Sequence, residues 1–189
     1  MDHWIERWQN GDQRAAEALY NEYREALFRL AYLLLSDTAD AEEVAQDALT
    51  YALINIDRYD AERASFKGWL NMLTVSRCRD KRRRKFLPSF SLSIWLGWGR
   101  DVADQRPTPE QATSHEEQNS AVYTAVQQLK PKLREAVLLR HWAGHSYVEM
   151  GEILGCSTRT AQSRVRLAHE QLHRLLHGRE QQLLEEGWR

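Results

Sequence analysis

Apolar side chains recur every three or four residues along most of this 189-residue chain, and this spacing restricts its fold more than any other feature. The pattern is typical of amphipathic helices that bury one face in a core. Ser36-Asp37-Thr38 interrupts it and offers a cap for a following helix, and Ser65 offers another. We therefore expect an all-α protein.

The periodicity fails between Pro88 and about Ser114, where prolines and glycines accumulate. The segment still carries apolar residues, Trp95 and Trp98 among them, which are too apolar for a plain linker. They either pack between domains, dock on a partner or collapse locally. We expect two small helical domains joined by a long linker, divided as 1–87, linker 88–118, 119–178 and a C-terminal tail 179–189.

A helix-turn-helix is expected at Ser146–His169. Ser146 and Glu149 have the spacing of a capping box, Gly155 ends the short helix, and Ser157 caps the next one. Two helices joined by a glycine-containing turn form a common DNA-binding unit. The alternative is an ordinary helical hairpin with a solvated polar face.

The second helix of this unit separates into an apolar and a polar face. Ala161, Val165 and Ala168 repeat on the apolar face, which Leu172 and Leu176 extend. The polar side chains opposite can donate hydrogen bonds to bases and phosphates in the major groove. The DNA-binding residues expected on this helix are Arg159, Thr160, Gln162, Ser163, Arg164 and Arg166.

Charge is distributed unevenly, although the net charge is only −1. The segment 37–47 carries five acidic and no basic residues, whereas 77–85 carries seven basic residues opposed only by Asp80. Separate acidic and basic faces suggest two kinds of partner. The alternative is two solvated helix faces.

Several classes of function find no support in the sequence. It has no glycine-rich phosphate loop, no zinc-binding spacing and no nucleophile elbow. We expect no catalytic residue, no metal and no cofactor. His169, His173 and His177 are spaced to hold a metal on one helix, but they also continue its polar stripe. Without a signal-peptide pattern or a long apolar run, we expect a cytoplasmic protein with no membrane contact of its own.

Four motifs occur in the order seen in one known family. The chain resembles the extracytoplasmic-function sigma factors of bacterial RNA polymerase over nearly its whole length, apart from the linker and the final dozen residues. The motifs are Ala15-Ala16-Glu17-Ala18-Leu19-Tyr20, Asp40-Ala41-Glu42-Glu43-Val44-Ala45-Gln46-Asp47, Ser65-Phe66-Lys67-Gly68-Trp69-Leu70 and Gly144-His145-Ser146-Tyr147-Val148-Glu149-Met150.

The resemblance implies a sigma factor, a protein that binds core RNA polymerase and directs promoter-specific transcription initiation, under control of an anti-sigma factor. The acidic helix would bind polymerase through Asp40, Glu43, Gln46 and Asp47. The second domain would bind the minus-thirty-five element as duplex DNA. The loop 58–65 and the helix after it would bind the melted minus-ten element, through Arg63, Trp69, Ser76, Arg77, Arg79, Arg82 and Arg83.

Three positions depart from the family pattern. The family commonly has asparagine in place of Ser76, and arginines in place of Leu167 and His169. A promoter sequence therefore cannot be transferred from the family to this chain.

Two other functions remain open from the residues alone. One is a stand-alone helix-turn-helix repressor or activator, which needs a dimer face for symmetric half-sites that the sequence does not reveal. The other is an all-helical scaffold or metal-responsive interaction protein that uses the tryptophan-rich linker and the histidine stripe.

Overall fold

The computed structural model describes residues 2–86 and 114–186, and every regular element in these two ranges is helical, as expected. Trp95 and Trp98 lie outside the described residues. The elements in chain order are α1 (Asp2–Gln9), α2 (Gln13–Leu35), α3 (Thr38–Ile54), η1 (Ile56–Arg58), α4 (Phe66–Phe86), α6 (Ser114–Gln128), α7 (Pro131–Val137), the π-helical η2 (Leu138–Trp142), α8 (Tyr147–Leu154) and α9 (Thr158–Glu186).

Helices α2 and α3 form a hairpin whose turn is fixed by local hydrogen bonds. Ser36 ends α2 in the left-handed conformation at φ 56°, and its N–H donates to the Tyr32 carbonyl at 2.8 Å. The Asp37 carboxylate then accepts from the Asp40 N–H at 2.9 Å and opens α3. The break expected at Ser36-Asp37-Thr38 is confirmed.

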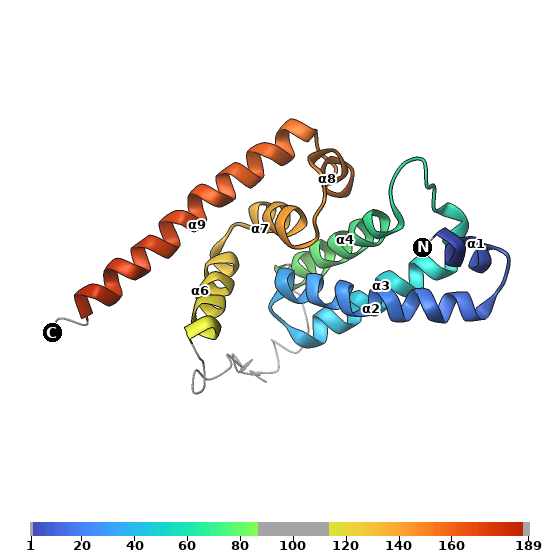
Figure 1. Ribbon diagram of the computed structural model, residues 1–189, viewed down its shortest axis with the longest axis horizontal. Helices are drawn as coiled ribbons and strands as arrows, with labels where there is room; N and C mark the ends of the chain where they lie inside the picture. The colour runs from blue at the N-terminus through green and yellow to red at the C-terminus, as the bar shows by residue number, and fades with distance from the viewer. Residues whose placement is uncertain (1, 87–113, 187–189) are drawn as a thin grey trace, which may run out of the picture.

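Helix α4 packs across this hairpin and completes the first helical unit (Figure 1). The Ser65 hydroxyl before this helix accepts from the Gly68 N–H at 3.1 Å, which confirms the expected cap.

Cys78 is fully buried, and this burial raises the pKa of its thiol to about 12. The thiol is therefore a packed group of low reactivity. Fully buried leucines line the three helices: Leu19, Leu27, Leu30, Leu34, Leu49 and Leu70.

The short helix α1 was not expected from the sequence. Ile5 is buried, and the Trp8 indole Nε1 donates to the Leu53 carbonyl at the end of α3, at 2.8 Å. The only sequence signal is the apolar set Trp4, Ile5 and Trp8, which is too short to establish a periodicity.

The second unit contains α6 to α9. Pro131 opens α7 at its first position, where its missing N–H costs nothing. Helix α7 continues directly into the π-helical turn η2, and Gly144 follows at φ +79°. Helix α9 extends far beyond the rest of this unit toward the C-terminus (Figure 1).

The two units share one apolar core. Leu30, Leu34 and Val75 of the first unit belong to the same buried cluster as Leu139 and Met150 of the second. Helix α4 lies between the α2–α3 hairpin and helices α7 and α8 (Figure 1), and its contacts with α8 are extensive. The structure therefore shows a closed arrangement, in which the two domains pack against each other.

Within 2–86 and 114–186, no helix is both long and apolar enough to span a membrane.

Candidate nucleic-acid and polymerase interface

The helix-turn-helix forms as the sequence predicts. The Ser146 N–H donates to the Glu149 carboxylate at 2.8 Å, and the Glu149 N–H donates to the Ser146 hydroxyl at 3.3 Å. Gly155 ends α8 at φ +65°. The Ser157 hydroxyl accepts from the Thr160 N–H at 3.2 Å and begins α9. These caps fix the angle between α8 and α9.

Gly151 is a requirement of this unit that no pattern in the sequence indicates. A Cβ at this position would lie 2.8 Å from the Cys156 backbone oxygen, closer than such atoms approach in proteins. The Cys156 N–H also donates to the Gly151 carbonyl at 2.9 Å. Helix α8 and the turn therefore pack too closely for any side chain here.

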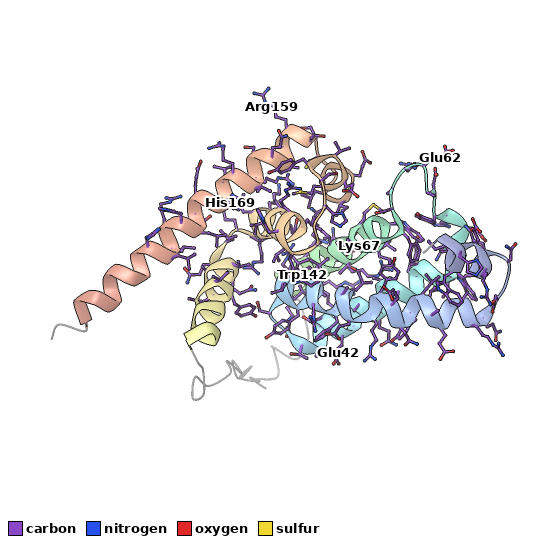
Figure 2. The ribbon with its side chains drawn as sticks, in the orientation of Figure 1. Glu42, Glu62, Lys67, Trp142, Arg159 and His169 are labelled. Carbon is purple, nitrogen blue, oxygen red and sulfur yellow. The ribbon has the colours of Figure 1, made fainter. Side chains whose placement is uncertain are left out.

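The first half of α9 presents the expected face. Ala161, Val165 and Ala168 are buried against α8 and α7. Arg159 projects into solvent at the start of the helix (Figure 2). The other predicted DNA-binding residues are exposed (Gln162, Ser163 and Arg166) or half-buried (Thr160 and Arg164).

Two departures from the family pattern lie along the same helix. Leu167 is 42% exposed, as single leucines on protein surfaces often are. The Nε2 atom of His169 lies 2.8 Å from Nε2 of His141 in η2, while His173 and His177 form a separate ring contact. Among the described residues, no group of three or more histidine, cysteine, aspartate or glutamate side chains is placed to hold a metal.

The acidic segment forms one face of α3. Glu43, Gln46 and Asp47 are exposed there. Asp40 is half-buried and pairs with Lys81 at 3.3 Å and with Lys85 at 2.6 Å, whereas Glu43 pairs with Lys81 at 2.5 Å. Lysines of α4 thus neutralise the N-terminal end of the face. Gln46 and Asp47 stay open to a partner.

The residues of α4 that are predicted to bind the minus-ten element lie on three faces of this helix. Trp69, Ser76 and Arg83 are seven residues apart and share one stripe, on which Ser76 and Arg83 are exposed. The Arg77 guanidinium lies over the Tyr51 ring of α3, 5.0 Å from its centroid. This arrangement places the three stripe residues together and separates Arg77 from them.

Arg79 and Arg82 face the second domain instead. Arg79 donates to Glu135 of α7 through two nitrogens, at 2.8 and 3.1 Å, and Arg82 pairs with the other oxygen of the same carboxylate. The Glu135 side chain is only 1% exposed. The prediction that these arginines contact DNA phosphates therefore requires a conformation other than the closed one.

Two further residues of the same α4 face contact the second domain. The Asn71 amide donates to Nε2 of His145 at 2.7 Å, and Lys67 Nζ donates to the Ala143 carbonyl at 2.8 Å. His145 is buried, and this burial lowers the pKa of its imidazole despite the nearby Glu149 carboxylate. The sequence gives only one weak signal for this interface, which is a histidine beside a capping box.

The loop before α4 contributes an aromatic cluster and a cavity. Tyr59 lies 5.6 Å from Trp69, measured between ring centroids. Beside them is a cavity of about 200 Å³, which Arg63 lines from the loop and Val148 lines from α8. The cavity thus spans both domains and exists in this form only while they are packed together.

Comparison with known proteins identifies each of the two helical units. The Sigma-70 region 2 family matches residues 19–86, and the family described as Sigma-70, region 4 matches 119–172. Among solved structures, CnrH in complex with the cytosolic domain of CnrY has a TM-score of 0.67 at 22% identity, covering 93% of this chain and 96% of that one. The sigma factor RpoE in complex with the anti-sigma factor NepR from Bartonella quintana has a TM-score of 0.65 at 24% identity, covering 85% and 96%.

Sequence relatives define the class more narrowly. The ECF RNA polymerase sigma factor SigW of Bacillus subtilis is 28% identical, over 91% of this chain and 94% of its own length. The ECF RNA polymerase sigma factor SigM of Mycobacterium tuberculosis is 32% identical, over 88% and 79%. A Sigma-70 region 2 domain followed by a region 4 domain with a helix-turn-helix places the chain among the sigma factors. The chain belongs to the ECF RNA polymerase sigma factors.

Membership of this family decides between the functions that the residues left open. The protein binds core RNA polymerase and directs transcription from specific promoters, rather than acting as a stand-alone helix-turn-helix regulator. The metal-responsive scaffold gains no support from the histidines, because His169 and His173 pair with different neighbours.

Proposed function

We propose that this sigma factor uses three separate surfaces, one for polymerase and one for each promoter element. The observation that supports this most strongly is the placement of three chemically distinct helix faces on α3, α4 and α9. The acidic face of α3 and the start of α9 lie on opposite sides of the molecule, as the labelled Glu42 and Arg159 show in Figure 2. Polymerase and duplex DNA can therefore be bound at the same time.

The polymerase surface is the exposed face of α3. Asp47 and Gln46 are open to solvent, while Glu43 and Asp40 at the N-terminal end are paired with lysines of α4. Acidic side chains of this kind can bind a basic surface of the polymerase by charge complementarity, which mainly speeds and orients association. We place the largest contribution on Asp47, because within residues 2–86 and 114–186 no lysine of α4 forms an ion pair with it.

The minus-ten surface is formed by the loop 58–65 and α4. Aromatic Tyr59 and Trp69 offer faces on which unpaired bases can stack, and Arg63 adds a positive charge beside them. Ser76 and Arg83 continue this surface along α4. Arg79 and Arg82 join it only after they leave Glu135.

The minus-thirty-five surface is the first half of α9. Arg159, Gln162, Ser163 and Arg166 have the lengths and donors needed for base edges and phosphates in a major groove. The half-buried Thr160 and Arg164 lie at the margins of this face.

An anti-sigma factor is the proposed regulator. Two solved structures with this fold hold their sigma factor in complex with such a protein or with the cytosolic domain of CnrY. The protein itself carries out no catalysis, takes no cofactor and makes no membrane contact of its own. It acts in the cytoplasm with the polymerase, which supplies the chemistry of RNA synthesis.

Separate variants test the separate surfaces. We expect Asp47→Lys to weaken binding to purified core polymerase, while Glu17→Lys, an exposed charge reversal on α2, leaves it unchanged. Arg159→Ala should keep polymerase affinity and lose only promoter affinity. If Asp47→Lys binds core polymerase as tightly as the native protein, the polymerase surface is placed wrongly. A pull-down from the host that recovers polymerase but never an inhibitor would count against the anti-sigma factor.

A further inference from the structure

The contact between α4 and the second domain has a composition that domain packing alone does not require. Four polar residues of one α4 stripe, spaced by three, four or eight positions, all bind the second domain: Lys67, Asn71, Arg79 and Arg82. Apolar groups already join the two domains through the shared core. These four polar contacts of α4 are therefore not needed merely to hold the two domains together.

Glu135 is the centre of this contact. Its carboxylate is 1% exposed, and both of its oxygens accept from arginines of α4. A buried carboxylate is unfavourable without cationic partners, so Glu135 is compatible with burial only while Arg79 and Arg82 remain beside it. When the domains separate, the carboxylate becomes solvated on the surface of α7.

A carboxylate that accepts from guanidinium groups occupies the same donors that a phosphate uses. Arginine binds both anions through the same planar array of N–H groups. Arg79 and Arg82 therefore cannot donate in this way to Glu135 and to a DNA phosphate at once.

We propose that Glu135 is an internal competitor of promoter DNA, holding the free protein closed by occupying the phosphate-binding arginines of α4. This inference rests on the proposed role of α4 in binding the minus-ten element. Opening of the domains then precedes DNA binding by α4, and any partner that separates the domains activates that surface.

Contacts between the second domain and α2 stabilise the same closed state. Gln127 donates to the Leu33 carbonyl at 2.9 Å, and Arg134 donates to the Leu34 carbonyl at 3.2 Å. These carbonyls belong to the last turn of α2, which lacks partners within its own helix. Opening exposes them to water, which can replace the lost donors. The charge of Glu135 is thus the part of the interface that responds to an anionic competitor.

The test measures domain separation and DNA binding in the same full-length protein. Dyes are attached at Asn21→Cys on α2 and His173→Cys on α9, both exposed positions, in a Cys156→Ser background. Cys78 can stay, because its buried thiol has a pKa of about 12. Energy transfer between the dyes reports closure. Fluorescence anisotropy with a labelled single-stranded minus-ten oligonucleotide, in the absence of polymerase, reports DNA binding.

Glu135→Gln keeps the side-chain shape and removes the charge. We expect lower energy transfer and affinity for the oligonucleotide raised about tenfold or more, since removing one partner of a buried ion pair has effects of this size or larger. The control Glu17→Gln, an exposed site on α2, should change neither. A combined Arg79→Gln and Arg82→Gln variant opens the same contact from the other side. It should lower energy transfer without raising DNA affinity.

Two results overturn the proposal: energy transfer unchanged by Glu135→Gln, or domains that separate while DNA affinity stays the same. Promoter-specific transcription with core polymerase is measured on the same samples. If the native protein supports transcription and Glu135→Gln fails these tests, the competition is refuted and the sigma-factor role stands. If no sample supports transcription, the proposed function itself fails.

Discussion

Replacing Gly151 by alanine tests how closely the two helices of the helix-turn-helix pack. The new Cβ would meet the Cys156 carbonyl oxygen at 2.8 Å, and the same turn is held by the hydrogen bond from the Cys156 N–H to the Gly151 carbonyl. Because the contact is with backbone, no side-chain rotation relieves it. The turn must open or α8 must shift.

The expected change in the free energy of unfolding of Gly151→Ala follows from two opposing effects. Glycine to alanine in a helix interior ordinarily stabilises by about 1 kcal/mol. Overpacking a fixed contact costs about 1–3 kcal/mol, and a backbone partner places Gly151→Ala near the upper end. The net expectation is a loss of about 2 kcal/mol. For a chain of this length, that lowers Tm by roughly 4–8 °C.

Thermal unfolding followed by circular dichroism measures this change. Val148→Ala is the matched control, because Val148 lies on the same helix and is 66% exposed. An exposed substitution of this kind is expected within about 0.5 kcal/mol of the native protein. A Tm that rises in Gly151→Ala, as for an ordinary helical glycine, would refute the packing argument.

Three further predictions concern DNA binding and pH. Arg159→Ala should weaken holoenzyme binding to a minus-thirty-five duplex by about 1–3 kcal/mol in competition assays, and an unchanged affinity would remove Arg159 from the interface. Leu167→Arg should add a phosphate contact and steepen the salt dependence of holoenzyme binding by about one unit of slope; an unaltered slope would place Leu167 away from the DNA backbone. Burial lowers the pKa of His145 below its usual 6.5, so the closed state favours the neutral imidazole. Its contribution to closure is complete above pH 6.5 and is lost as the pH falls through the lowered pKa. Energy transfer between the domains should therefore decrease between about pH 7 and about pH 5, and this decrease should be smaller in His145→Gln; equal decreases in both proteins would exclude His145 as the cause. The charged groups that surround this imidazole are Lys67, Arg140 and Glu149.

The helix boundaries near caps were predictable because their signals are local. Ser36, Ser65, Ser146 and Gly155 each act within a few residues of their own position, and the structure confirms each. The exposed residues of α9 were predictable for the same reason. A helix of regular pitch places residues three or four apart on one face, so the apolar repeat also identifies the exposed face.

The distribution of the α4 arginines was not predictable in this way. Arg79 and Arg82 have the same basic character as Arg83, but they pair with a carboxylate more than fifty residues further along the chain. Only the packing of the second domain distinguishes them. The burial of Glu135 is the reason, because a charge on a buried helix face requires a partner; Arg134 and Ala136, its neighbours in the sequence, do not mark it as buried.

The central claim is that this chain gives core RNA polymerase its promoter specificity. Transcription in vitro, with purified bacterial core polymerase and a promoter mapped from start sites after overexpression, tests it most directly. We predict transcripts with a single defined start that require the chain and are reduced by both Asp47→Lys and Arg159→Ala. Absence of core binding together with absence of promoter-specific initiation would contradict the account.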